Sequence, residues 1–407
     1  MSKARLRFFE NSVNQRHITD ADRYLYRQDP PRYKLVVIGT GTMGQEHMRV
    51  AALLGRASVL GIYDAHTHSM DAAEQAYRLI SSEPLRRYDS LESACNDPEA
   101  DVLMICTPNH THLDVLKTVL ASGKPIFLEK PMATTLADAA ALMEAAQSHS
   151  AFVQIGLQYR YKAQYREAFH EVQARHSLGR VHTISMSEYR PPFLDKVGQW
   201  NKFNRNTGGT LVEKCCHYFD LINLMADSTA VRVYASGGQA VNFLDFKKAG
   251  ESADIDDHAF VCIDYANGVR ASFTLNMFCP DFTEEMIVVG EQGRLITSER
   301  FDFHAQVPTQ TSINVELGEN GASRRTELSY PKLIEQSGHH GATYYEHIAL
   351  MDQLDGKAAD CATVEQGLWS MIVASAAQAS MASGLAINIE HFLQEQHLQH
   401  FMTGNSK

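Results

Sequence analysis

The stretch that decides the fold is KLVVIGTGTMGQEHMRVAALL, residues 34–54. It begins with a short apolar, β-branched run that is typical of a buried strand, passes through three glycines and continues as an amphipathic helix. Gly39, Gly41 and Gly44 form the pattern G-x-G-x-x-G, and Asp64 follows at the end of a second apolar run. A strand, this loop, a helix and an acidic residue in that order predict a dinucleotide-binding unit.

Each glycine has a physical task in such a unit. Gly39 permits the tight turn, Gly41 lets the backbone approach a pyrophosphate, and Gly44 allows the helix to pack closely on the strand. The pyrophosphate lies on the free N–H groups and the positive dipole end of the helix. The other loop residues expected beside it are Thr40, Thr42 and Met43. Asp64 is expected to bind the adenosine ribose and to repel a 2′-phosphate, which favours NAD over NADP.

Strands and helices continue to alternate after this loop. Apolar strands are expected at residues 57–64, 100–108, 124–131 and 151–160, with helices at residues 70–81, 112–122 and 136–148. Strands that are apolar throughout and are followed by helices require a parallel sheet covered on both faces. We therefore predict an α/β architecture with a doubly wound Rossmann domain over residues 33–158. An arm at residues 1–32 precedes it, either packed on the body or a partner subunit or loosely ordered.

The pattern changes after about residue 160. Helices are expected at residues 163–176, around residues 213–225, and at residues 343–354 and 364–383. Alternating segments are expected as strands at residues 181–189, 230–238, 258–268, 269–278, 285–296 and 311–318. This alternation predicts an α+β domain over residues 159–395 with a large open, mainly antiparallel sheet, followed by a tail at residues 396–407. An open sheet face of that size predicts an oligomer interface.

Composition excludes several classes of protein. The formal net charge of −11 argues against broad affinity for nucleic acid. The N-terminal residues lack the apolar core of a secretory signal, and no segment approaches the roughly 20 apolar residues of a membrane span. Seven cysteines without a repeated spacing indicate a reduced, cytoplasmic chain. Cys215, Cys216 and His217 are adjacent and would point in different directions on a helix, so we expect no metal site.

Three further segments carry a resemblance to a known family. They are CTPNHTH at residues 106–112, EKP at residues 129–131 and TGGTLVEKCCHYFD at residues 207–220. Together with the glycine loop, they resemble the glucose–fructose oxidoreductase, inositol dehydrogenase and rhizopine catabolism family from about residue 33 to at least residue 389. The resemblance implies a Rossmann domain that binds NAD(P), a second domain whose open sheet forms homodimers or homotetramers, and substrates that are sugars, cyclitols or their derivatives.

The resemblance also implies roles for individual residues. Lys130 matches the lysine of the family's EKP motif, and Glu213 and His217 match the acid and the histidine of its D-x-x-x-H pattern. The residues expected near the cofactor in the other two motifs are Thr107, Pro108, Asn109, His112 and Glu129. Two departures are present, because Glu213 replaces the commoner aspartate and Cys215 stands where a glycine is usual, with the cationic Lys214 beside the acid.

Oxidation of a secondary alcohol requires a base for the hydroxyl proton and a charge that stabilises the developing alkoxide. His217 is expected as the base because an imidazole titrates near neutral pH. Glu213, four residues earlier on one helix face, is expected to orient or polarise it, or alternatively to stabilise the helix N-terminus. Lys130 lies at the carboxyl end of a strand, where open α/β sheets bind ligands, and is expected to bind the substrate oxygen.

The wall of the substrate site is expected to combine aromatic and cationic side chains. The candidates are Tyr159, Arg160, Trp200, Arg205 and Lys214, with core packing or surface ion pairs as the alternative. Asp220 receives no chemical role. His339 and His340 are interpreted as cap, surface or substrate-cleft residues rather than metal ligands.

These observations predict an NAD-dependent oxidoreductase that transfers a hydride between nicotinamide and a ring hydroxyl or ketone of a sugar, cyclitol or sugar derivative. An alternative is a redox-assisted glycosidase on the same scaffold, which needs a further base such as Lys214, Glu213 or Tyr159. A non-enzymatic NAD-binding sensor is disfavoured, because Lys130, Glu213 and His217 are all present.

Overall fold

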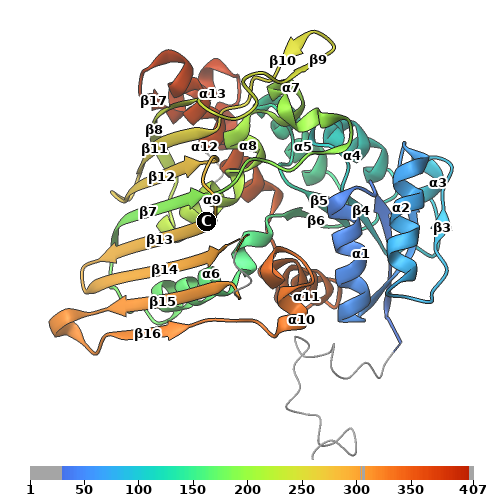
Figure 1. Ribbon diagram of the computed structural model, residues 1–407, viewed down its shortest axis with the longest axis horizontal. Coiled ribbons are helices and arrows are strands. Elements are labelled where there is room, and N and C mark those ends of the chain that lie inside the picture. The colour runs from blue at the N-terminus through green and yellow to red at the C-terminus, as the bar shows by residue number, and fades with distance from the viewer. Residues whose placement is uncertain (1–29, 303, 305–307, 403–407) are drawn as a thin grey trace, which may run out of the picture.

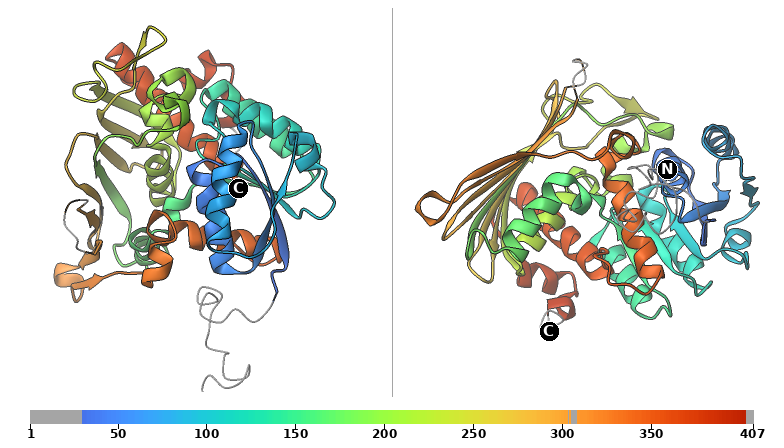
Figure 2. Two further views of the ribbon diagram at one scale, coloured as in Figure 1. Left: turned by 45° about the vertical axis from the view of Figure 1, so that its right-hand side comes forward. Right: turned by 90° about the horizontal axis from the view of Figure 1, so that it is seen from below.

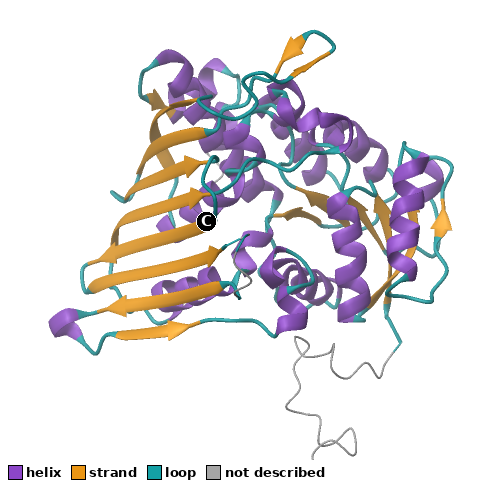
Figure 3. Cartoon of the chain, in the orientation of Figure 1, coloured by secondary structure: helices purple, strands orange, loops and turns teal. Residues whose placement is uncertain are grey.

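The computed structural model describes residues 30–302, 304 and 308–402. Two sheets dominate it, a six-stranded sheet from the first part of the chain and a nine-stranded sheet from the second (Figure 1). Most of the helices lie between and around the two sheets (Figure 3). Most of the expected N-terminal arm and the end of the expected tail lie outside the described residues.

The smaller sheet is parallel throughout and has the strand order β3-β2-β1-β4-β5-β6. Its strands are β1 (Tyr33–Ile38), β2 (Ala57–Tyr63), β3 (Arg86–Arg87), β4 (Val102–Ile105), β5 (Ile126–Glu129) and β6 (Val153–Gly156). The helices are α1 (Thr42–Leu54), α2 (Thr67–Arg78), α3 (Leu91–Cys95), α4 (His112–Leu120) and α5 (Leu136–Gln147). The strand order reverses between β1 and β4, and ligands bind at such a point in open α/β sheets.

Two short elements of this domain were not predicted. The strand β3 consists of two exposed arginines, and α3 has only five residues. Neither length is sufficient to show a hydrophobic period in the sequence. The α2 helix covers residues 67–78, so it begins and ends three residues before the predicted helix at 70–81.

The glycine loop between β1 and α1 is packed as the sequence predicts. Gly39 has a φ of +93°, and a Cβ added to it would lie 2.6 Å from the Cys106 carbonyl carbon at the end of β4. A Cβ on Gly44 would lie 2.1 Å from the Gly39 carbonyl oxygen, so only glycine allows α1 to lie this close to the loop. A Cβ on Gly41 would meet nothing within 4 Å, which leaves its face of the loop open.

The larger sheet has the strand order β16-β15-β14-β13-β7-β12-β11-β8-β17. The strands are β7 (Val181–Tyr189), β8 (Ala230–Gly238), β11 (His258–Tyr265), β12 (Arg270–Asn276), β13 (Phe282–Gly290), β14 (Gly293–Phe301), β15 (Gln310–Glu316), β16 (Arg324–Glu327) and β17 (Ile387–Asn388). Only β7 and β12 pair in parallel. A separate hairpin is formed by β9 (Lys247–Lys248) and β10 (Glu251–Ser252). Helices pack on one face of the sheet and leave the other uncovered, as expected (Figure 2).

The helices of the second part are α6 (Ala163–Phe169), which continues as a π-helical turn, α7 (Asn204–Thr207), α8 (Thr210–Glu213), α9 (Cys216–Ala226), α10 (Lys332–Glu335), α11 (Ala342–Leu354), α12 (Val364–Ser383) and α13 (Ile389–Glu395). The prediction of one helix around residues 213–225 is wrong, because α8 ends at Glu213 and α9 begins at Cys216. Cys215, between them, has a φ of −86° and a ψ of −6°. The spacing of Glu213 and His217 therefore does not place them on one helix face.

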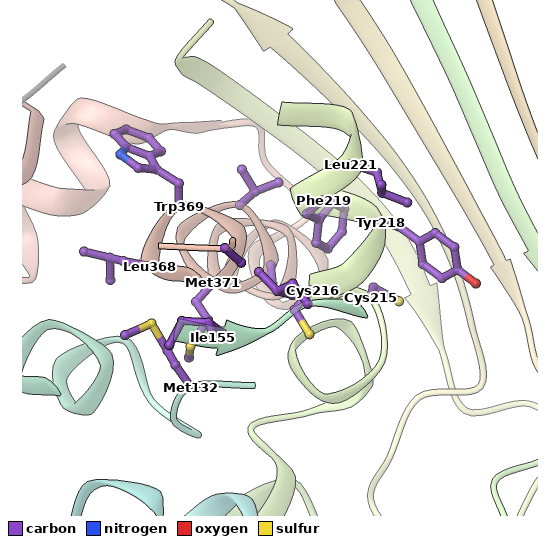
Figure 4. Packing of buried hydrophobic residues seen from close by; sticks show 14 of the residues in the cluster. Met132, Ile155, Cys215, Cys216, Tyr218, Phe219, Leu221, Leu368, Trp369 and Met371 are labelled. Atoms are coloured by element: carbon purple, nitrogen blue, oxygen red, sulfur yellow. The ribbon is translucent and has the colours of Figure 1, made fainter. Parts of the chain in front are cut away.

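Apolar packing joins the two parts of the chain, most extensively in one large core. Met132 and Ile155 from the first part pack with Cys215, Phe219, Leu368 and Met371 from the second (Figure 4). Both adjacent cysteines, Cys215 and Cys216, are buried in this core. Among the described residues, no helix is long and apolar enough to cross a membrane, and no group of His, Cys, Asp or Glu side chains has the arrangement of a metal site.

The glycine loop gives a test of packing. We expect Gly44→Ala to lower the free energy of unfolding by about 1–3 kcal/mol, because its Cβ overlaps the Gly39 carbonyl oxygen. Gly41→Ala is the matched control, with an expected change below about 1 kcal/mol, since its φ is −70° and its Cβ would be unobstructed. The measurement is urea unfolding followed by circular dichroism. Equal destabilisation by both changes would contradict this account of the loop.

Candidate active site

A cleft runs along the carboxyl ends of β1, β2, β4 and β5. The predicted residues that line it are Gly39, Gly41, Thr42, Met43, Asp64, Thr107, Pro108, Asn109, Glu129, Lys130, Trp200 and Glu213. Five further lining residues were not predicted as site residues, namely His66, Ser69 and Cys106 from the first part of the chain and Lys196 and Val197 from the segment before α7. The cleft thus brings the glycine loop together with the three later motifs.

The end of the cleft at the glycine loop fits a dinucleotide. The α1 helix has Gly41 as its N-cap and no side-chain cap, so its first N–H groups are available to an anion. The open face of Gly41 leaves room for a pyrophosphate to approach the backbone. Thr40 and Gly44 are buried behind this surface and support it.

Asp64 closes this end of the cleft and holds the loop. Its Oδ2 accepts hydrogen bonds from the Thr40 N–H at 2.7 Å and the Thr40 hydroxyl at 3.1 Å. Its Oδ1 accepts from the His66 N–H at 2.9 Å. Two lysines, Lys130 and Lys196, also line the cleft, but neither belongs to the glycine loop. Lys130 is part of the EKP motif, and Lys196 lies in the segment before α7. The carboxylate is therefore the charged lining group at the glycine loop.

Lys130 lies where the two parts of the chain meet. Its Nζ donates to the Glu213 carbonyl oxygen at 3.2 Å, so it connects the end of β5 to the end of α8. Burial acts to lower the pKa of Lys130, but the attraction of Glu213, followed by those of Cys216 and Glu129, raises it overall. The side chain is consequently an ammonium at neutral pH and can stabilise a negative oxygen.

A buried chain of hydrogen bonds holds the residue before this lysine. Glu129 Oε2 accepts from the Lys130 N–H at 3.0 Å, and Glu129 Oε1 lies 2.8 Å from His47 Nε2. His47 Nδ1 in turn lies 2.8 Å from His347 Nε2 in α11. Burial would raise the pKa of Glu129, but the His47 hydrogen bond and charge lower it. His47 and His347 were not identified from the sequence, because nothing in their spacing shows that α1 and α11 pack together.

His217 is a buried imidazole on which the charge of Lys130 acts. Its ring stacks on Tyr159 with centroids 4.0 Å apart and planes 8° from parallel. Its Nδ1 is buried and has no hydrogen-bond partner among the described residues. Burial, and then the charges of Lys130 and Lys214, lower the pKa of His217 well below its usual range. The ring is therefore neutral at neutral pH and can accept a proton.

Glu213 does not pair with this histidine. Its carboxylate accepts a hydrogen bond from Asn109 Nδ2, at the end of β4. The predicted orientation of His217 by Glu213 is accordingly replaced by an orientation through the ring stack with Tyr159. Lys214 Nζ donates to the Tyr159 hydroxyl at 2.5 Å and lies 3.0 Å from Glu188 Oε1.

Three residues expected at the cofactor or substrate have other surroundings. Arg160 donates to both oxygens of buried Asp220 at 2.6 and 2.5 Å. Arg205 is exposed and forms an ion pair with Glu251, away from the cleft lining. Both ring nitrogens of His112 lie 2.9 Å from backbone carbonyl oxygens, those of Pro131 and Thr107, so it joins the two motif loops from behind. Residue type alone does not show which charged side chains form ion pairs with each other in the folded chain.

A second cavity adjoins the Tyr159–His217 stack, because Tyr159 is part of its wall. It is lined by Tyr159 together with Lys162, Arg190, Phe282, Phe301, His339 and His340. Only His339 and His340 had been considered as cleft residues. The others come from several strands and loops, so only the folded chain brings them together.

Comparison with known proteins agrees with this architecture. A family model described as an oxidoreductase family with an NAD-binding Rossmann fold matches residues 33–157, and its C-terminal alpha/beta domain matches residues 174–389. The chain is 22% identical to the uncharacterized oxidoreductase YrbE of Bacillus subtilis over 87% of this chain and 96% of that protein. It is 32% identical to inositol 2-dehydrogenase of Paracoccus denitrificans, over 32% of this chain and 39% of that enzyme.

Solved structures share the fold at low sequence identity. A crystal structure of a putative myo-inositol dehydrogenase from Sinorhizobium meliloti has a TM-score of 0.68 and 20% identity, and covers 88% of this chain and 99% of its own. Levoglucosan dehydrogenase, in complex with NADH and L-sorbose, has a TM-score of 0.71 and 17% identity, with 88% and 98% covered. Because both domain models match, over more than half of its length, the chain belongs to the glucose–fructose oxidoreductase, inositol dehydrogenase and MocA family of oxidoreductases.

Proposed function

We propose that this oxidoreductase is NAD-dependent and interconverts a ring hydroxyl and a ketone of a sugar, a cyclitol or a sugar derivative. The observation that carries the proposal is a half-buried ammonium, Lys130, that lines a cleft fitting a dinucleotide and whose charge acts on a buried neutral imidazole, His217. The inositol dehydrogenases among the relatives and the sugar-bound levoglucosan dehydrogenase support this substrate class.

The side chains divide the work of the reaction. Bound NAD supplies a nicotinamide that accepts the hydride. Lys130 binds the substrate oxygen and stabilises the negative charge that develops there. His217 removes the hydroxyl proton, and Tyr159 keeps its ring in one plane. The Asn109–Glu213 hydrogen bond links the two parts of the chain at the same place.

His217 gives the first test of this division. We expect His217→Gln to reduce turnover at least about 10²-fold while NAD binding is retained, because a positioned base contributes about 10²–10⁴-fold. Stopped-flow absorbance of NADH measures hydride transfer, and calorimetric titration measures NAD binding. His391→Gln, an exposed histidine on α13, is the matched control. Unchanged hydride transfer in the His217 variant would remove this residue from the mechanism.

The pH profile of the wild-type enzyme adds a second readout. Protonation of His217 would inactivate the base, and the pKa of His217 is lowered by burial, Lys130 and Lys214. Activity should therefore persist as the pH falls through the range in which an ordinary histidine titrates, and decline only at more acidic pH. An acid limb at the ordinary value would contradict a buried, cation-flanked base.

We also propose that NAD is preferred over NADP, because Asp64 is the charged group at the glycine-loop end of the cleft. Asp64→Asn should improve the affinity for NADP relative to NAD by about tenfold or more, since it removes the charge that faces a 2′-phosphate. Calorimetric titration of both nucleotides measures the ratio, with the surface variant Asp71→Asn as the control. Tighter binding of NADP than NAD to the wild type would contradict the proposal.

The open face of the larger sheet supports a homodimer or homotetramer. Phe260 is 61% exposed on this face, and Tyr234 on the adjacent strand β8 is 46% exposed. We expect Phe260→Glu to shift the wild-type oligomer to a smaller species in light scattering, whereas Leu79→Glu on the first domain should not. A monomeric wild type would contradict the proposed assembly.

All seven cysteines are free thiols, which supports a cytoplasmic location.

The redox-assisted glycosidase is retained as a second candidate because of one observation. Burial lowers the pKa of Lys214, although Glu188 opposes this, and Lys214 Nζ donates to the Tyr159 hydroxyl. This pair could remove a proton next to a newly formed ketone. Release of an aglycone without accumulation of NADH would favour this function over net oxidation.

A further inference from the structure

The cavity beyond Tyr159 has a volume of about 180 Å³ and an unusual wall. Phe282 and Phe301 supply apolar surface, and Lys162 and Arg190 supply two cations. Tyr159 belongs both to this wall and to the stack with His217, so the cavity begins one ring away from the proposed base. A substrate that reaches His217 can extend into this space.

The charge of Lys162 is fully balanced by the protein. Its Nζ lies 2.6 Å from Glu284 Oε2 and 2.6 Å from Glu299 Oε1, and all three side chains are buried. Glu284 also accepts hydrogen bonds from the hydroxyls of Tyr165 and Tyr218, at 3.0 and 2.7 Å. Lys162 therefore has no charge left over for a ligand.

Arg190 differs in this respect. Its nearest carboxylate oxygen, Glu188 Oε1, is 3.6 Å from Nη1, and the same oxygen lies closer to Lys214 Nζ, at 3.0 Å. One buried carboxylate thus faces two cations, and Lys214 takes the shorter contact. The Arg190 Nε donates to the Pro191 carbonyl oxygen at 3.0 Å, and the guanidinium lies over the Phe193 ring. Arg190 is accordingly the least balanced cation of this cavity wall.

The backbone fixes the place from which this guanidinium projects. Arg190 follows directly after β7, its N–H donates to the Asn276 carbonyl oxygen at 2.8 Å, and its carbonyl oxygen accepts from the Cys279 N–H at 3.0 Å. The positive charge of Arg190 reaches the reacting groups. It acts with burial to lower the pKa of Lys130, against the attraction of Glu213. It also acts to lower the pKa of Tyr159, which burial and nearby carboxylates raise. The residue is thus both anchored and electrostatically close to the chemistry.

We propose that this cavity receives the carboxylate of an acidic polyol, such as a uronic acid, and that Arg190 binds that carboxylate. The inference rests on the proposed function and narrows its substrate class. A guanidinium presents paired N–H donors that match the two oxygens of a carboxylate. A single unbalanced cation fits a monoanion, whereas a phosphate dianion would need more positive charge than this wall leaves available.

The electrostatics at His217 support the same substrate class. Besides burial, the charges that lower the pKa of His217 are cations, namely Lys130, Lys214, His339 and Lys162. A carboxylate bound at Arg190 would offset part of this positive potential. The imidazole of His217 would then become a stronger base only when the substrate carboxylate is bound at Arg190.

The test compares matched pairs of substrates that differ at one carbon. The pairs are glucose with glucuronate, galactose with galacturonate and mannose with mannuronate, with glucose 6-phosphate as a dianionic probe. The measured quantity is the ratio of kcat/KM for the acid to kcat/KM for its neutral partner, with NAD saturating. We expect the wild type to favour the acid at least tenfold in one or more pairs, and Arg190→Gln to lower that ratio at least tenfold through a higher KM for the acid.

Two further variants keep the result interpretable. Arg190→Lys retains the charge but loses the paired donors, so its ratio should fall between those of the wild type and Arg190→Gln. Arg294→Gln removes an exposed arginine that pairs with Glu316 on the same sheet, and it should leave the ratio unchanged. Retained NAD binding, measured by calorimetry, shows that each variant is folded.

The outcomes separate this inference from the proposed function. Oxidation of the neutral sugars as well as or better than the acids, or a ratio unaffected by Arg190→Gln, would overturn the carboxylate site and leave the oxidoreductase standing. Preference for glucose 6-phosphate would overturn it in favour of a phosphate. If no member of the panel is oxidised, the proposed function fails for these substrates, and calorimetric titration of glucuronate decides the site. Glucuronate binding that is present in the wild type and lost in Arg190→Gln supports the carboxylate site. Absence of glucuronate binding to the wild type overturns it.

Discussion

An ammonium that is partly removed from water requires negative or polar partners, and Lys130 has them in both parts of the chain. Its N–H donates to the Glu129 carboxylate, and its Nζ donates to the Glu213 carbonyl oxygen at the end of α8. His47 holds Glu129 from the first helix, and the common apolar core keeps the two parts from separating. The lysine is therefore fixed in the cleft that it shares with the glycine loop, and its Nζ is tied to the segment that precedes α9 and His217.

The same charge sets the protonation state of the proposed base. Burial and the neighbouring cations keep His217 neutral, so it is ready to accept a proton, but they also oppose the imidazolium that results. A negatively charged substrate group at Arg190 would relieve this opposition at the moment of reaction. In this account the buried carboxylates Glu188, Glu284 and Glu299 serve to balance Lys214 and Lys162, so that Arg190 is the cation of the cavity wall that is left to a substrate carboxylate.

The fold and the cofactor cleft could be predicted largely from the sequence because their signals are local. The glycine loop, its strand and its helix are contiguous, and the tight contacts of Gly39 and Gly44 follow from that pattern. The break between α8 and α9 could not be predicted, because the residues on either side of it follow a helical apolar pattern. The surroundings of Arg160, paired with Asp220, and of Arg205, at the surface, depend on partners distant in the sequence.

The cavity beyond Tyr159 shows the same limit. Arg190 belongs to no recognisable motif. Its role depends on how the Glu188 carboxylate is shared between Arg190 and Lys214, which are 24 residues apart in the sequence. Burial and charge balance are properties of the folded chain, and they decide which of several lysines and arginines can reach a ligand. The motifs locate the cofactor, whereas the substrate class has to be argued from these tertiary contacts.

The activity proposed for this enzyme is net hydride transfer from a polyol to NAD. Its most direct test is absorbance at the NADH band during incubation of the NAD-saturated protein with sugars, sugar acids, cyclitols and aryl glycosides, with product identification by mass spectrometry. The account predicts one NADH for each ketone formed. Release of an aglycone with NAD retained and no NADH, or no reaction with any polyol, would contradict it.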